Sequence, residues 1–460
     1  MMMLNETAIA AFRSTLLGEL IEPRDPKYEE ARQVYNAMIN RRPRLIARCA
    51  DVADVLAAVN FGREQKLAVA VRGGGHNAGG LGVCDDGLVI DLSPLNYVRV
   101  DARKKTVLVG GGARWRDVDH ATHAFGLAVP AGVISTTGVG GLTLGGGIGY
   151  LTRRYGLTVD NLLAVEMVLA DGRFVTASAK AHADLFWAVR GGGGNFGVVT
   201  AFLFKAHPAH TDYGGPMMWP LEDAAEMLRW YRGFIAKAPN DINGFFAFLT
   251  VPPGPPFPEH LHNKKMCAIV WCYAGGQKKA EKVFKVIRAF KAPALDLAGP
   301  IPHPQLQSLF DGLYPPGLQM YWKADFVRTL PDEAIALHLE HAAKLPTMLS
   351  TVHFYPINGA ASRVKNNATP WAYRDATWAS VTVGIDPDAA NKEKITAWAK
   401  EYWTALHPYS AGGGYLNFMM DEGEGPVRAT YGKNYERLAK IKKRYDPTNF
   451  FRVNQNIKPK

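Results

Sequence analysis

Cysteine is scarce in this chain, with four residues among 460. No two of them form a Cys-x-x-Cys pair, so their spacing matches neither a zinc site nor the disulfide framework of a small secreted domain. We therefore expect no metal, no disulfides and a reducing compartment. The four residues are Cys49, Cys84, Cys267 and Cys272.

Long apolar runs are also missing, since no stretch reaches the roughly 18 residues that a membrane-spanning helix needs. The N-terminal residues lack the basic and apolar regions of a secretory signal. These two absences predict a cytoplasmic protein without a membrane partner.

Concentrated positive charge is missing as well. The formal charge of +11, from 53 basic and 42 acidic residues, could indicate a polyanionic partner. The basic residues are scattered, however, and no nucleic-acid-binding module is visible. We expect a monomer or homodimer that has no nucleic-acid partner.

Glycine, in contrast, is abundant, with 46 residues, many of them in blocks at 71–77, 136–149 and 190–200. Val69 and Val71 alternate with small or polar residues, so a strand leads into the three glycines of the first block. Such a turn lets backbone N–H groups approach a phosphate closely. His76 follows directly and could touch the rest of a nucleotide cofactor, although an ordinary tight turn would explain this block alone equally well.

The third block contains a G-x-G-x-x-G pattern at Gly192, Gly194 and Gly197. In a dinucleotide fingerprint this pattern opens a helix, whose N-terminus receives the pyrophosphate. Here residues 198–205 form a β-branched and aromatic run that predicts a strand. The context therefore argues against an NAD-type site.

Taken together, the three blocks resemble the FAD-binding domain of the vanillyl-alcohol oxidase/p-cresol methylhydroxylase superfamily, and within it the bacterial berberine-bridge-enzyme-like flavoproteins. Residues 160–162 and 446–457 extend the resemblance over nearly the whole chain. It implies an α+β fold, with a two-subdomain FAD-binding domain of p-cresol methylhydroxylase type made of residues 1–212 and 411–460. Residues 213–410 alternate helical and strand-like patterns, which predicts a substrate domain with an antiparallel sheet covered by helices.

The resemblance implies FAD as the cofactor, and His76 matches the histidine that bonds covalently to the flavin 8α-methyl group. A neutral imidazole is a competent nucleophile for that bond; the alternative is noncovalent FAD packed against His76. Many relatives form a second bond through a cysteine, but Ile134 stands at that position, so we predict a single bond. The residues expected to bind FAD are Arg72, Gly73, Gly74, Gly75, His76, Asn77, Thr136, Thr137, Gly138, Gly140, Gly141, Thr143, Gly146, Gly147, Gly149, Asn195, Gly197, Val199, Tyr415, Asn417 and Asn454.

Tyr415 and Asn417 match a Y-x-N motif, and in the strand expected at 414–418 both would point to one face. The resemblance implies that Tyr415 is the catalytic base and that Asn417 holds the flavin ring. A tyrosine has a reference pKa of about 10, so it needs a nearby cation to act as a base at neutral pH. Lys323 resembles a family lysine that faces the cavity, and we expect it to supply that charge. The alternatives are a core tyrosine and an exposed lysine.

Several aromatic residues and one histidine occupy strand-like positions in the substrate domain. Such residues belong to a core more often than to a pocket, so we expect two or three of them to line the cavity. They are Trp271, Tyr273, Tyr321, His353, Tyr355, Trp371 and Tyr373.

The sequence thus predicts an FAD-dependent oxidase of a small organic substrate, an alcohol, sugar, amine or phenolic compound. The substrate would give a hydride to flavin N5, Tyr415 would take a proton, and dioxygen would be reduced to hydrogen peroxide. One alternative is a dehydrogenase of the same fold that uses another electron acceptor. The other is a non-catalytic flavoprotein, which Tyr415, Asn417 and Lys323 argue against.

Overall fold

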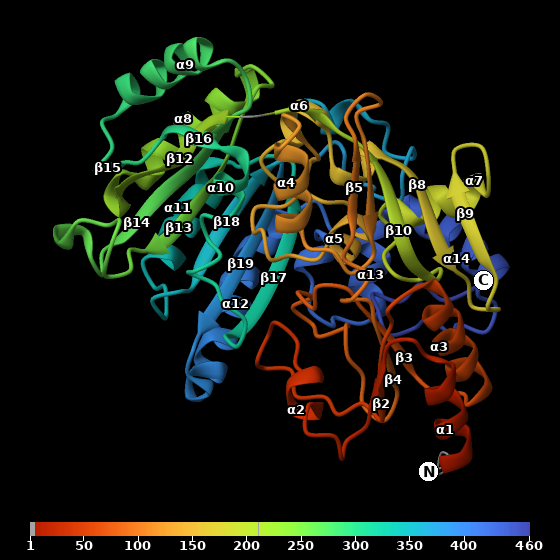
Figure 1. The fold of residues 1–460 in the computed structure, drawn as a ribbon. Coiled ribbons are helices and arrows are strands. Elements are labelled where there is room, and N and C mark those ends of the chain that lie inside the picture. The colour runs from red at the N-terminus through yellow and green to blue at the C-terminus, as the bar shows by residue number, and fades with distance from the viewer. Residues whose placement is uncertain (1–4, 210) are drawn as a thin grey trace.

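The structure is a computed structural model that describes residues 5–209 and 211–460. Its strands form sheets of four, five, two and eight strands, accompanied by helices in every part of the chain (Figure 1). This mixed architecture confirms the predicted α+β fold. No helix among the described residues is long and apolar enough to cross a membrane.

The four-stranded sheet has the order β1-β2-β4-β3, and both β2 and β3 run parallel to β4. The strands are β1 Glu19–Ile21, β2 Leu45–Arg48, β3 Val69–Arg72 and β4 Leu88–Asp91. Between β2 and β3 lies α3 (Val52–Glu64), where the Asp51 side chain accepts a hydrogen bond from the Asp54 N–H and caps the helix. Residues 45–72 therefore form a strand–helix–strand unit whose helix is N-capped by Asp51.

The five-stranded sheet is antiparallel, in the order β5-β6-β10-β8-β9. Its strands are β5 Val98–Asp101, β6 Thr106–Gly110, β8 Leu162–Val168, β9 Phe174–Ser178 and β10 Val198–Lys205. A hairpin turn at residues 171–172 joins β8 to β9, and Gly172 has the positive φ of +85° that this turn requires.

Helices from both ends of the sequence pack against this second sheet, around one apolar core. They are α4 Trp115–His123, α7 Ala183–Val189, α13 Glu424–Tyr431 and α14 Tyr435–Tyr445. In Figure 1 the blue α14 accordingly lies beside the yellow α7. The C-terminal helices thus share a core with segments from the first part of the chain, and the division into domains at residues 212 and 411 stays a prediction.

The eight-stranded sheet has the order β15-β12-β14-β13-β18-β19-β17, with β16 paired to β12, and every pairing is antiparallel. Its strands are β12 Thr211–Pro220, β13 Ile242–Thr250, β14 Lys265–Tyr273, β15 Leu295–Asp296, β16 Gly299–Pro302, β17 Gln319–Val327, β18 Thr351–Pro356 and β19 Trp378–Asp386. One face packs against the helices α8 Ala224–Lys237, α9 Gln277–Phe290, α11 Asp332–Ala342 and α12 Lys392–Leu406. Side chains on the other face pack against residues of the second glycine block and its continuation.

Three local features differ from what the sequence indicated or were not found in it. The second glycine block is not all loop, because it contains the short helix α5 (Val139–Leu144), held by packing despite its two glycines. The stretch expected to be a strand at 414–418 is instead the single 3₁₀ turn Leu416–Phe418, which begins after Tyr415. Helix α12 follows its sheet strand without having been predicted from the sequence.

The two halves of the molecule meet at Arg153, on the short helix α6 (Thr152–Tyr155). Its guanidinium is almost fully buried and donates hydrogen bonds to backbone carbonyls where α8 ends and β13 begins, and to the side chain of Asn358. A cation at a helix C-terminus also complements the helix dipole. The accepting carbonyls are those of Ile235, Ala238, Pro239 and Ile242.

A second buried arginine crosses the same junction. Arg374 donates two parallel hydrogen bonds, each 2.7 Å long, to the two carboxylate oxygens of Asp160. Bidentate pairs of this kind fix orientation as well as distance. Together, Arg153 and Arg374 determine how the eight-stranded sheet lies over the glycine blocks.

Candidate functional site

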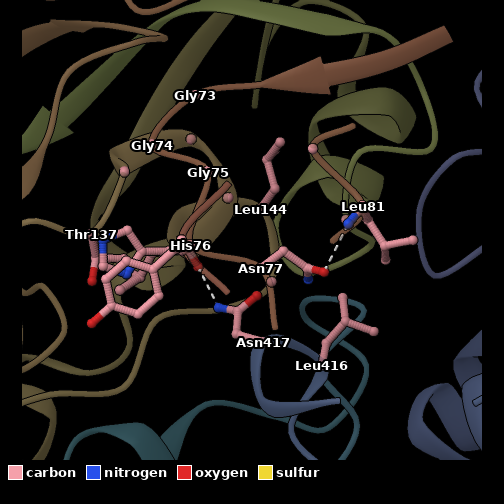
Figure 2. A pocket seen from close by; sticks show the side chains of 18 of the residues that line it. Gly73, Gly74, Gly75, His76, Asn77, Leu81, Thr137, Leu144, Leu416 and Asn417 are labelled. Atoms are coloured by element: carbon pink, nitrogen blue, oxygen red, sulfur yellow. Dashed lines mark hydrogen bonds between the residues drawn. The ribbon is translucent and has the colours of Figure 1, made fainter. Parts of the chain in front are cut away.

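A cavity of about 300 Å³ lies between the glycine blocks and the eight-stranded sheet. All three blocks contribute to its lining, as do residues 415–418 and 451–455 near the C-terminus and strands β17, β18 and β19. Figure 2 shows the first block with His76 and Asn77 facing this space, with Leu416 and Asn417 approaching from the C-terminal region. The cavity thus joins segments that are far apart in the sequence.

The first and second glycine blocks touch backbone to backbone at Gly74 and Gly138. A Cβ atom on Gly74 would lie 2.4 Å from the Gly138 nitrogen, and one on Gly138 would lie 2.3 Å from the Gly74 nitrogen. Neither distance is possible in a folded protein, so both positions require glycine for a reason internal to the protein.

Two other glycines line the cavity without any such internal reason. A Cβ atom on Gly141 or Gly194 would meet no protein atom within 4 Å. Close approach of a bound group to the backbone accounts for glycine at these positions. The Oδ1 atom of Asn454, which also lines the cavity, is buried and has no partner in the described part of the chain. These features fit a large cofactor that is held mainly by backbone groups.

His76 stands at the cavity edge of the first block, beside Thr137 (Figure 2). Its ring stacks on Tyr35, with a centroid distance of 3.9 Å and an interplanar angle of 18°. Burial and, to a lesser extent, the nearby Arg114 lower the pKa of His76 to about 3, although a hydrogen bond with the Thr136 backbone offsets part of the shift. The imidazole is therefore neutral at physiological pH, with one nitrogen engaged by the backbone.

Ile134 lines the same cavity, at the position where a second bond to the cofactor was considered. All four cysteines are buried elsewhere, and none of them belongs to the lining residues.

Tyr415 and Asn417 lie together as predicted, although the turn that carries them is not a strand. The Tyr415 hydroxyl oxygen accepts hydrogen bonds from Asn417 Nδ2 at 2.7 Å and from the Gly147 backbone N–H at 3.0 Å. Burial raises the pKa of Tyr415 to about 12, and these hydrogen bonds only partly counter that effect. Tyr415 is consequently a neutral phenol at physiological pH.

The prediction that Lys323 faces the cavity is wrong. Alternation along β17 turns Met320 and Trp322 toward the cavity and Lys323 toward the other face of the sheet. There its ammonium group pairs with Glu422 at 2.9 Å and lies 4.1 Å from the ring centre of Trp403 on α12. Lys323 therefore cannot lower the pKa of Tyr415 in the way the sequence suggested.

Most of the residues expected to bind FAD do line the cavity. They are Arg72, Gly73, Gly74, Gly75, His76, Asn77, Thr137, Gly138, Gly140, Gly141, Gly197, Val199, Tyr415, Asn417 and Asn454. The remaining ones are not among the lining residues and are Thr136, Thr143, Gly146, Gly147, Gly149 and Asn195.

Asn195 illustrates the supporting role of this second group. Its amide donates hydrogen bonds to the carbonyls of Gly192 and Gln455, and its Oδ1 atom accepts one from the Ile457 N–H. It therefore ties the third glycine block to the C-terminal segment instead of lining the cavity.

Sequence reasoning missed Tyr35 as a lining residue. Tyr35 lies outside every motif, and no local sequence pattern predicts that its ring stacks on His76. Of the seven residues expected to supply two or three lining side chains, His353 and Tyr355 do so. They share one face of β18, so strand alternation was the signal that could have selected them.

Comparison with known proteins agrees with this geometry. A model described as "FAD binding domain" matches residues 43–178, and one described as "Berberine and berberine like" matches residues 414–458. An FAD-linked oxidoreductase of Dictyostelium discoideum is 33% identical over 444 residues, covering 94% of each chain. The chain belongs to the berberine-bridge-enzyme-like FAD-linked oxidoreductases. It is therefore an enzyme, and its cofactor is FAD.

Further relatives come from several kinds of organism, and they do not identify the substrate of this enzyme. The (R)-6-hydroxynicotine oxidase of Paenarthrobacter nicotinovorans is 29% identical, covering 97% of each chain. The crystal structure of a 6-hydroxy-D-nicotine oxidase from Arthrobacter nicotinovorans has a TM-score of 0.87 at 27% identity, covering 97% of this chain and 98% of the other. Because relatives also come from an amoeba and from fungi, the narrower resemblance to bacterial members of this family stays a prediction.

The contrast between Gly74 and Gly141 makes a testable prediction. We expect Gly74→Ala to destabilise the fold by about 1–3 kcal/mol or more, because the added methyl group overlaps backbone atoms. Gly141→Ala should leave the folded protein intact but lower its FAD content, because its methyl group projects into the cavity. Far-UV circular dichroism and flavin absorbance per mole of protein measure the two effects. A Gly141→Ala variant with full FAD content would show that the cofactor does not approach this backbone.

Proposed function

We propose that this enzyme is an oxidase of a small organic substrate, with dioxygen as the final electron acceptor and hydrogen peroxide as the product. The observation that carries the proposal is the meeting, in one largely apolar cavity, of the glycine blocks with His76, Tyr415 and the uncharged wall of the eight-stranded sheet. When bound, FAD supplies a two-electron acceptor for a hydride from the substrate. Gly141, Gly194 and Asn454 are among the residues that would hold it.

We further propose that His76 alone forms a covalent bond to the flavin. Its imidazole is neutral, and one ring nitrogen is engaged by the Thr136 carbonyl, which leaves the other nitrogen as the nucleophile. A second bond would need a thiol where Ile134 stands.

Tyr415 is proposed to accept a proton from the substrate. The hydrogen bonds from Asn417 and Gly147 stabilise negative charge on its oxygen as that charge develops. With Lys323 on the far face of the sheet, these two donors and not a cation provide the stabilisation. Asn417 thus acts as a positioning residue for the phenol.

An anaerobic screen for flavin bleaching tests the activity. Neutral alcohols, amines, phenolic compounds and sugars are mixed with the protein, and air is then admitted to any sample that bleaches. Rapid return of the yellow colour with formation of hydrogen peroxide is the expected result. Bleaching that persists in air would indicate a dehydrogenase, and no bleaching with any compound would point to a non-catalytic flavoprotein.

The covalent bond is tested by acid precipitation. We expect the flavin to stay with the wild-type precipitate and to leave it in His76→Ala, which keeps the glycine blocks and so retains noncovalent FAD. A peptide map should show the flavin mass on the His76 peptide only. Complete release of FAD from the wild-type protein would contradict the bond, and flavin on a cysteine peptide would contradict its being single.

The role of Tyr415 is tested by the rate of flavin reduction. Because the pKa of Tyr415 is about 12, the deprotonated fraction, and with it the rate, should rise with pH throughout the range from 7 to 10. Tyr415→Phe should slow the reduction by about 10²–10⁴. Lys323→Met is the matched control and should leave the pH profile unchanged, because this ammonium group does not face the cavity.

Stopped-flow measurements with a substrate found in the screen decide the outcome. A Tyr415→Phe variant that is reduced as fast as the wild type would remove Tyr415 from the chemistry.

A further inference from the structure

The sheet wall of the cavity carries no charged side chain among the described residues that line it. It consists of Met320 and Trp322 on β17, Thr351, His353 and Tyr355 on β18, and Val381, Val383 and Ile385 on β19. Arg72 is the one charged residue in the described lining, and it belongs to the first glycine block, where it pairs with Asp91 at 2.8 Å. An ionic ligand against the sheet wall would therefore lack a counter-charge.

A single hydrogen-bonded pair interrupts this wall. His353 Nδ1 lies 2.9 Å from the Tyr355 hydroxyl group, whereas the neighbouring Thr351 hydroxyl is already used, donating to the Phe248 carbonyl. No described residue hydrogen-bonds the second ring nitrogen of His353, Nε2. His353 is half-buried and lines the cavity, so this nitrogen is available to a ligand.

The pair can act as a donor or as an acceptor. Burial lowers the pKa of His353 to about 3, so the ring is neutral at physiological pH. If Tyr355 donates to Nδ1, then Nε2 carries the hydrogen and donates to the ligand. If Nδ1 carries the hydrogen and donates to Tyr355, then Nε2 accepts. In either arrangement, Nε2 of His353 can form one hydrogen bond with a neutral polar group of the ligand.

Aromatic rings surround this polar point. The Tyr355 ring lies 5.5 Å from that of Phe418, and the Trp322 ring lies 5.6 Å from that of Phe418 in an edge-to-face arrangement. The Phe245 ring lies 5.0 Å from the His353 ring. Such walls favour a flat apolar ring over a molecule covered with hydroxyl groups.

We infer that the substrate is a neutral molecule with an aromatic ring and a hydrogen-bonding group, and that His353, positioned by Tyr355, binds that group. This inference rests on the proposed function and narrows its substrate class, disfavouring sugars and carboxylates. A carboxylate would lose its hydration without gaining a cationic partner. A sugar would leave most of its hydroxyl groups unpaired against apolar side chains.

Calorimetric titration of the FAD-containing enzyme at pH 7.5 tests the inference with four probes: phenol, fluorobenzene, benzoate and D-glucose. Phenol is neutral at this pH and has no alkyl carbon that could give up a hydride, so binding is measured without turnover. We expect phenol to bind about threefold to tenfold more tightly than fluorobenzene, the advantage of one neutral hydrogen bond. Benzoate and glucose should bind at least about 100-fold more weakly than phenol.

The matched variant is His353→Phe, which keeps a ring but removes its nitrogens. It should lower the affinity for phenol to that for fluorobenzene, while the affinity for fluorobenzene stays unchanged. Wild-type benzoate or glucose affinity equal to that of phenol would overturn the inference without requiring any variant to fold. Unchanged phenol affinity in His353→Phe would overturn it too. Absence of FAD from the purified protein, in contrast, would overturn the proposed function itself.

Discussion

The buried guanidinium of Arg153 is the contact on which the arrangement of this molecule depends. It satisfies backbone carbonyls at the end of α8 and the start of β13, although it belongs to the segment that follows the second glycine block. Burial lowers the pKa of Arg153 to about 10, so it stays charged at neutral pH. With the Arg374–Asp160 pair, it holds one face of the eight-stranded sheet above the glycine blocks. The shape of the cavity depends on these contacts, because they fix the position of the sheet relative to the glycine blocks.

Local signals in the sequence predicted much of the fold. The strand expected at residues 198–205 is present as β10, because a run of β-branched and aromatic residues is a local signal. The turn at Gly172 and the cap at Asp51 likewise depend on a few neighbouring residues. Helix α5 and the turn after Tyr415 were misread because tertiary packing, not local propensity, determines their conformation.

The sequence predicts the site residues whose type is required by the backbone geometry. It does not predict the direction in which a side chain points. The glycines at positions 74 and 138 could be recognised in the sequence as a sign of close backbone contact, because no other residue fits there. The direction of Lys323 depends on which face of β17 meets the glycine blocks, and that is settled only by the docking of the whole sheet. The contact of Tyr35 with His76 likewise joins segments that no pattern relates.

The third glycine block is held by residues that come about 260 positions later in the chain, as the Asn195–Ile457 and Asn454–Gly194 hydrogen bonds show. Domains fold largely in order as they leave the ribosome. In this chain, however, the walls of the cavity cannot all be in place until the segment up to Ile457 has emerged. The apolar side chains of the earlier cavity walls therefore lack their final packing partners until the end of synthesis. Complete binding of FAD is therefore a late event that follows synthesis of these C-terminal residues.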